Sequence, residues 1–135
     1  MSNLSIEQQA ADALLQAQVS GKAIGPIRET IGANNIAAAY NIQKINTDKR
    51  IAQNEKVVGK KIGLTSFAVQ KQLGVDQPDY GVLFDSMQVR EGVLPFSHLQ
   101  QPKAEAEIAF VLSEDLTRDV NMSDLINAID YAAVS

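Results

Sequence analysis

The sequence predicts an α+β fold in which helices near the start are followed by strands. Two observations support this prediction. Apolar residues recur at helical spacing within the first 52 residues. From residue 57 onward, short apolar or alternating runs bounded by Gly, Pro and Asp are typical of strands. With 135 residues, the chain can bury one sizeable core but is short for two.

Two helices are expected in the N-terminal part. Residues 5–19 carry an apolar stripe, and Ser5 with Gln8 three residues later resembles a capping box. Glycines and a proline then form a loop. A second helix is expected over residues 35–52, and its inner face is broad: Ile36, Ala39, Tyr40, Ile42, Gln43 and Ile45.

The following stretch is expected to hold a strand and a short helix. Residues 57–64 are expected to form a strand. It contains two glycines, which indicate that another group approaches the strand backbone closely there. Ser66 could cap a helix that runs to Leu73 and stops at Gly74. Residues 74–92 are rich in loops and contain one short apolar run, residues 82–84.

The last part is expected to hold the clearest strand and a final helix. The strand is predicted over residues 103–112. Ser123 is expected to cap a helix with four residues facing inward: Leu125, Ile126, Ile129 and Ala132. This helix has no terminating Gly or Pro before Ser135, a pattern that indicates a chain cut short.

Composition excludes several classes of function. The net charge is −4 and there is no basic stripe, so we expect no nucleic-acid partner. The chain has no cysteine, which excludes disulfides, thiolate metal sites and a cysteine nucleophile. No apolar run approaches the ~18–20 residues of a membrane span, and the start lacks the features of a signal peptide. We expect a cytoplasmic protein with no membrane partner.

Glu105 and Glu107 form the strongest local signal. In a strand they share one face, roughly 6.5–7 Å apart along the chain, and that face becomes apolar beyond them. Two carboxylates entering an apolar region repel each other unless a proton or a cation intervenes, and Mg²⁺ or Mn²⁺ prefers such oxygen ligands. An edge strand with its acidic face in water explains the same spacing.

A second signal is the lysine of the first strand. Lys61 shares a face with Gly59 and Gly63, whose missing side chains leave room for a ligand. Such a lysine could pair with a substrate carboxylate or stabilise an enolate. An exposed surface lysine is the alternative.

A third signal is the segment Gly74–Gly81, which contains Asp76 and Asp79. Asp, Pro and Gly are ordinary turn residues, but an Asp held in a tight turn at a cleft can act as a general acid or base. The single histidine, His98, has no partner pattern. No Ser-His-Asp arrangement, phosphate-binding loop or dinucleotide fingerprint is present.

Four segments in order resemble the 2-oxopent-4-enoate (2-hydroxypenta-2,4-dienoate) hydratases of the fumarylacetoacetate hydrolase superfamily. The segments are Ala38–Gln43, Val57–Ser66, Gln72–Phe84 and Gln101–Leu112. The resemblance implies a truncated mixed β-roll: residues 1–55 would be an N-terminal helical region and residues 56–135 the first part of the catalytic β-roll, with the remainder absent.

The resemblance also implies a set of site residues. Glu105 and Glu107 match two of three metal-binding carboxylates, and the third would lie after Ser135. Lys61 and Asp79 match the family's active-site lysine and aspartate. Ser66 and Asp76 are weaker candidates for substrate binding. The cofactor would be Mg²⁺ or Mn²⁺.

The implied activity is that of a lyase (hydro-lyase) in the degradation of aromatic compounds by meta-cleavage. Water would add to 2-hydroxypenta-2,4-dienoate to give 4-hydroxy-2-oxopentanoate, and a chain of this length is expected to be inactive alone. Family members are usually homo-oligomers and can associate with other enzymes of the pathway.

Two alternatives stay open at this stage. The first is the homologous 2-oxo-3-hexenedioate (4-oxalocrotonate) decarboxylase, although the segment from Asp76 to Gly81 is more similar to the hydratases; other activities of the superfamily rank lower. The second is a non-catalytic interaction domain, in which Glu105 and Glu107 are only a solvated pair.

Overall fold

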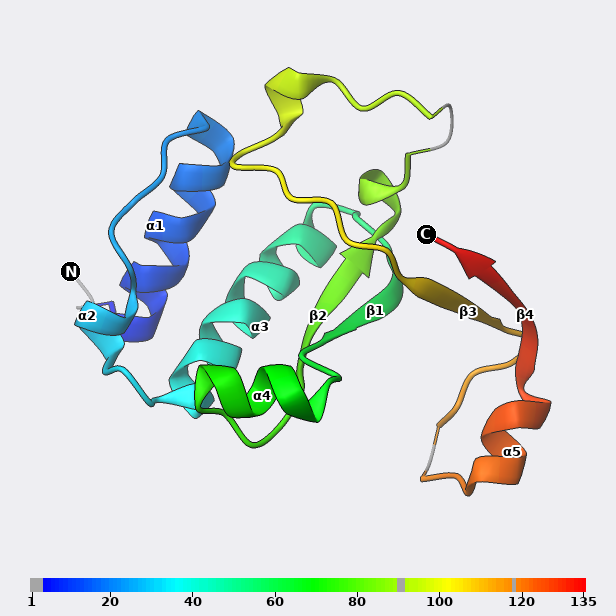
Figure 1. Ribbon diagram of the computed structural model, residues 1–135. Coiled ribbons are helices and arrows are strands. Elements are labelled where there is room, and N and C mark those ends of the chain that lie inside the picture. Colours follow the sequence, from blue (N-terminus) through cyan, green and yellow to red (C-terminus); the bar gives the residue numbers. More distant parts are fainter. Residues whose placement is uncertain (1–3, 90–91, 118) are drawn as a thin grey trace. The chain divides into compact units, whose positions relative to one another are not determined.

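The structure is a computed structural model that describes residues 4–89, 92–117 and 119–135. It contains two compact units, Met1–Gln100 and Gln101–Ser135, which we describe separately (Figure 1). The expected domain division after residue 55 stays a prediction.

Three helices begin the first unit: α1 (Ile6–Ser20), α2 (Arg28–Ile31) and α3 (Ile36–Ala52). The Gln8 backbone N–H donates to Ser5 Oγ at 3.1 Å, so the predicted cap of α1 is confirmed. The Gln8 side chain donates to Asp12 instead of returning to the cap. Asn35 caps α3 through the Ala38 N–H. Both predicted helices are confirmed within one or two residues.

A small apolar core joins α1 and α3. Ile42 is 1% exposed and packs with two alanines of α1, Ala10 and Ala11. Partly buried aliphatic side chains surround them: Leu14, Ile27, Ile31 and Ile45. In Figure 1, α3 lies between α1 and a two-stranded hairpin. Helix α3 therefore contacts both α1 and the hairpin.

The hairpin consists of β1 (Val57–Gly63) and β2 (Asp79–Phe84), which pair antiparallel. They are connected through α4 (Phe67–Leu73), which ends at Gly74 in the left-handed conformation, as predicted. Strand β2 begins at Asp79, although only residues 82–84 were predicted as an apolar run. The reason is tertiary: residues 79–81 pair with β1, and α3 binds the Tyr80 backbone. Two short 3₁₀ turns follow, Asp85–Met87 and Phe96–His98.

The second unit is the hairpin of β3 (Ile108–Leu112) and β4 (Ile129–Val134), with α5 (Met122–Asn127) between the strands. Two predictions are wrong here. The strand predicted from residue 103 begins at Ile108. The final helix ends at Asn127, is capped by the Asn121 side chain instead of Ser123, and is followed by a strand. Pairing with β3 satisfies the backbone of residues 129–134.

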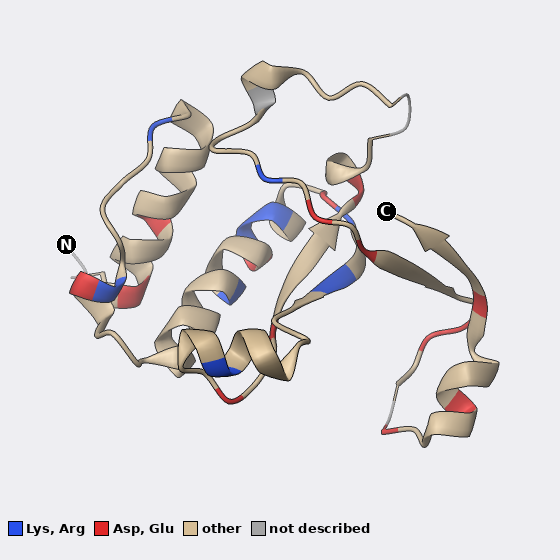
Figure 2. Cartoon of the chain, in the orientation of Figure 1, with Lys and Arg blue, Asp and Glu red and all other residues tan. Residues whose placement is uncertain are grey.

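Charged residues of both signs are distributed over several helices and strands. Lys and Arg residues are spread over α2, α3, β1 and α4, with acidic residues among them (Figure 2). No helix in the described part of the chain is long and apolar enough to cross a bilayer.

Candidate active site

Lys61 and Asp79 lie on the same face of the β1–β2 hairpin. Lys61 is paired with Gly81, and Gly63 is paired with Asp79. Directly opposed residues of an antiparallel pair share a face, as do alternate residues along each strand. The two side chains are therefore diagonal neighbours, for which Cβ atoms are roughly 7–8 Å apart or less. The structure thus brings together two candidates that are distant in the sequence.

The carboxylate of Asp79 lies directly over Gly63. A Cβ added to Gly63 would overlap Asp79 Oδ1. The expectation that Gly63 leaves room for a ligand is therefore wrong, because this room is taken by the Asp79 side chain. At Gly59 a Cβ would meet only Leu83 Cδ1, at an ordinary distance of 3.8 Å. Of the two glycines, Gly63 is the one that the site requires.

The residue after Asp79 is held by α3. The Tyr80 ring stacks on the Tyr40 ring, with centroids 4.7 Å apart and an angle of 23° between the planes. The Tyr80 N–H donates to Tyr40 Oη at 3.3 Å, and Gln43 Nε2 donates to the Tyr80 carbonyl oxygen at 3.2 Å. Sequence reasoning had placed Tyr40 and Gln43 on the apolar face of the helix without a role. The sequence did contain a signal for this role: a tyrosine and a glutamine three positions apart lie on one side of a helix and can bind the same neighbouring group.

The other end of β2 is also tied to α3. Arg50 Nε donates to Glu55 Oε1 at 2.8 Å, and the Ser86 hydroxyl donates to Glu55 Oε2 at 2.6 Å. The Arg50 guanidinium also lies 3.9 Å from the centroid of the Phe84 ring. Hydrogen bonds from Arg50 and Ser86 lower the pKa of Glu55 to about 2. Strand β2 is thus held to α3 at both of its ends.

Ser66 and Asp76 are both exposed and lie on either side of α4. Ser66 occupies the N-cap position of α4, although its hydroxyl makes no capping hydrogen bond. Gln70, which is 5% exposed, donates to the Leu64 carbonyl oxygen at 2.6 Å and so fixes the segment before Ser66. Asp76 lines a groove of about 540 Å³ between the start of α3 and the loop before β2.

Glu105 and Glu107 belong to the second unit, whereas Lys61 and Asp79 belong to the first. Both glutamates are exposed and precede β3. The Glu107 backbone exchanges two hydrogen bonds with Ser135, at 3.0 and 3.1 Å, which continues the β3–β4 ladder by one pair. The predicted strand through both glutamates is therefore wrong, because the ladder reaches Glu107 and the regular strand begins only at Ile108.

The chemistry of these two carboxylates fits a hard divalent cation, which takes oxygen ligands, but two donors are an incomplete set. Within residues 4–89, 92–117 and 119–135, no group of three or more His, Cys, Asp or Glu side chains is placed to hold a metal ion. The side chain of His98 lies outside the part of the chain that the structure describes.

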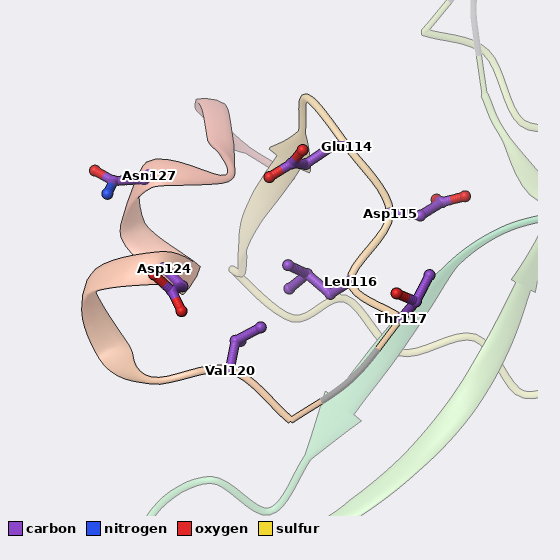
Figure 3. A pocket seen from close by; sticks show the side chains of 7 residues that line it. All are labelled: Glu114, Asp115, Leu116, Thr117, Val120, Asp124 and Asn127. Atoms are coloured by element: carbon purple, nitrogen blue, oxygen red, sulfur yellow. The ribbon is translucent and has the colours of Figure 1, made fainter.

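The second unit also contains an acidic pocket of about 320 Å³. Figure 3 shows its lining side chains on the β3–α5 loop and on α5. Three of them are carboxylates: Glu114, Asp115 and Asp124. None of the site residues predicted from the sequence lines this pocket.

Comparison with known proteins identifies relatives of the chain. No family model matches it. It is 51% identical to 2-keto-4-pentenoate hydratase of Paraburkholderia xenovorans strain LB400 over 126 residues, which cover 92% of this chain and 47% of the relative. It is 50% identical to the TodF product hydratase of Pseudomonas putida strain F1, with 93% and 47% covered. The chain is a relative of the N-terminal half of the 2-keto-4-pentenoate hydratases.

This similarity confirms the resemblance predicted from the sequence, since 2-keto-4-pentenoate is 2-oxopent-4-enoate. The chain spans about half the length of the curated hydratases that it matches.

Solved structures show the fold. A 4-oxalocrotonate decarboxylase from Pseudomonas putida G7, complexed with magnesium and adipate, matches with a TM-score of 0.84 and 35% identity. The match covers 98% of this chain and 52% of the decarboxylase. A second structure of that enzyme, with calcium and acetate, matches equally well. The mixed helix-and-sheet architecture is thus shared with enzymes of the fumarylacetoacetate hydrolase superfamily, which confirms the α+β prediction.

Proposed function

We propose that this chain supplies the N-terminal part of a hydratase that adds water to 2-hydroxypenta-2,4-dienoate and forms 4-hydroxy-2-oxopentanoate. The observation that carries the proposal is the identity of about 50% with 2-keto-4-pentenoate hydratases over more than nine-tenths of the chain. The common face of Lys61 and Asp79 supports it, because that face offers a cation and an acid–base group side by side.

Glu105 and Glu107 are proposed as two ligands of a divalent cation, Mg²⁺ or Mn²⁺. Support comes from their carboxylate chemistry and from the magnesium and calcium in the related decarboxylase structures. When bound, such a cation acts as a Lewis acid on the carboxylate and 2-oxygen of a 2-oxo acid.

Lys61 and Asp79 are proposed to act on the substrate itself. In the overall reaction the 2-hydroxyl proton is lost, C5 gains a proton, and water adds its oxygen at C4 and a proton at C3. The Lys61 ammonium would stabilise negative charge on the substrate oxygen. The Asp79 carboxylate would orient the water and accept or return its proton. Ser66 and Asp76 are proposed to bind the substrate.

A decarboxylase acting on 4-oxalocrotonate is the second candidate. The observation that favours it is the structural match to such an enzyme at 35% identity. The hydratase is preferred because its identity with this chain is higher, at about 50%.

Calorimetric and kinetic experiments on the protein in its natural length test the proposal. Mn²⁺ is titrated with and without oxalate, which mimics the 2-oxo acid. Turnover of 2-hydroxypenta-2,4-dienoate is then compared with that of 4-oxalocrotonate. We expect Mn²⁺ binding that oxalate strengthens and hydration of the dienoate without release of CO₂. Faster decarboxylation of 4-oxalocrotonate would favour the second candidate, and no turnover of either compound would overturn both.

Several properties of the whole protein are proposed on the same basis. We propose a homo-oligomeric, cytoplasmic enzyme that works in aromatic catabolism and can associate with neighbouring enzymes of its pathway. The mixed β-roll, of which residues 56–135 would be the first part, is proposed for the same reason. Size-exclusion chromatography with light scattering tests the oligomer.

A further inference from the structure

We propose that Tyr40 and Gln43 are positioning residues that hold the Asp79 carboxylate in place through the Tyr80 peptide. This inference rests on the proposed function, in which Asp79 acts on the substrate. Neither residue is assigned a direct role on the substrate. The inference follows from which backbone groups α3 binds and from the alternation of side chains in β2.

Helix α3 binds both backbone polar groups of Tyr80. Tyr40 Oη accepts from its N–H, and Gln43 Nε2 donates to its carbonyl oxygen. A neighbouring β-strand would offer the same combination of one acceptor and one donor to a residue at a sheet edge. Two helix side chains, three positions apart and therefore on one side of α3, take the place of that strand.

Holding Tyr80 determines where Asp79 points. Successive side chains of a strand point to opposite faces, so stacking of Tyr80 on Tyr40 directs Asp79 to the other face. On that face Asp79 meets Gly63 and becomes a neighbour of Lys61. A slip of β2 by one residue would exchange the two faces and carry Asp79 away from Lys61.

Strand β2 needs such support at this end. Asp79 is its first residue and follows a loop that ends in Pro78. Tyr80 remains 54% exposed, so burial alone holds it weakly. Gly63, the partner of Asp79, has no side chain to pack against it. Together with the pairing to β1, the two hydrogen bonds and the ring stack from α3 therefore favour one position of this end of β2.

A double-mutant cycle in the protein of natural length tests the inference. Tyr40→Phe removes the acceptor and keeps the ring stack, and Gln43→Leu removes the donor at similar size. Asn41→Ala is the matched control, because Asn41 lies on the same helix but donates to Glu7 of α1. We expect kcat for 2-hydroxypenta-2,4-dienoate to fall roughly tenfold in each single variant and up to about a hundredfold in the double variant. KM and the Mn²⁺–oxalate affinity should change less than threefold, and the control should match wild type.

The Asp79→Asn background separates positioning from general stabilisation. If Tyr40 and Gln43 act through Asp79, removing them from the Asp79→Asn protein lowers single-turnover rates no further. The same fractional loss in both backgrounds, or no loss in the Asp79⁠-containing protein, would overturn the inference. Full activity of Asp79→Asn itself would instead overturn the proposed role of Asp79. Gln43→Met replaces Gln43→Leu if the latter lowers the thermal midpoint.

Discussion

The Asp79 carboxylate occupies the space that a side chain at Gly63 would fill, and these two residues face each other across the β1–β2 hairpin. The absence of a Cβ at residue 63 therefore leaves free the space in which the acidic group of the proposed active site lies. Lys61 is on the same face, two residue pairs further along the hairpin. From this arrangement we predict variants that change the activity without changing the stability, and others that change the stability.

Gly63→Ala should reduce activity without destabilising the fold. The added Cβ would displace Asp79 Oδ1, and we expect kcat to fall at least about tenfold because the carboxylate moves. Gly63 is not in the left-handed region, so alanine fits its backbone and should leave the thermal midpoint unchanged or raise it slightly. Gly59→Ala is the control, since its Cβ would meet Leu83 only at 3.8 Å. Equal activity of the two variants would contradict the prediction.

Lys61→Ala should lower kcat by about a hundredfold or more, as expected when a group that stabilises developing charge is lost. The adjacent Lys60 is the control. It pairs with Val82, so its side chain leaves the opposite face of the hairpin, and Lys60→Ala should retain nearly full activity. Steady-state kinetics with 2-hydroxypenta-2,4-dienoate measures both. Similar losses of kcat in the two variants would contradict the prediction, because the effect would then not depend on which face of the hairpin carries the lysine.

Glu105→Gln and Glu107→Gln should each weaken Mn²⁺ binding in the presence of oxalate by about tenfold or more, because a neutral amide is a poorer ligand for a hard cation. Glu114→Gln, in the acidic pocket of Figure 3, is the control and should bind Mn²⁺ like wild type. Calorimetry reads the affinity directly. If only Glu114→Gln loses binding, the metal site belongs in that pocket.

Stability should depend on Glu55 in a defined pH range. Arg50 and Ser86 lower the pKa of Glu55 from 4.5 to about 2. A depressed pKa means that the ionised form is favoured in the folded state, so its stabilising contribution is complete above pH 4.5 and disappears as the pH falls towards 2. The thermal midpoint of Glu55→Gln should therefore lie below that of wild type at pH 7, and the two should converge at low pH. A constant difference across this range would contradict the assignment.

Helices α1, α3 and α4 and the strand β1 were predictable because their signals are local. The Ser5 cap, the apolar spacing of residues 36–52 and Gly74 after α4 each act within a few residues of the chain. The wrong predictions occur where local patterns are ambiguous. Residues 129–134 have a short apolar run that suits a helix or a strand, and pairing with β3 decides for the strand. Strand β2 includes Asp79 and Tyr80, whose turn-like sequence is overruled by α3 and β1.

The sequence by itself determined the family resemblance, the α+β class and the candidates Lys61, Asp79, Glu105 and Glu107. Residue types and their order along the chain are sufficient for these conclusions. Only the tertiary structure decided that Lys61 and Asp79 share a face, that Asp79 covers Gly63, and that Tyr40 and Gln43 hold Tyr80. The physical reason is that the register of a hairpin and the binding of a helix to its edge depend on contacts between residues far apart in the chain.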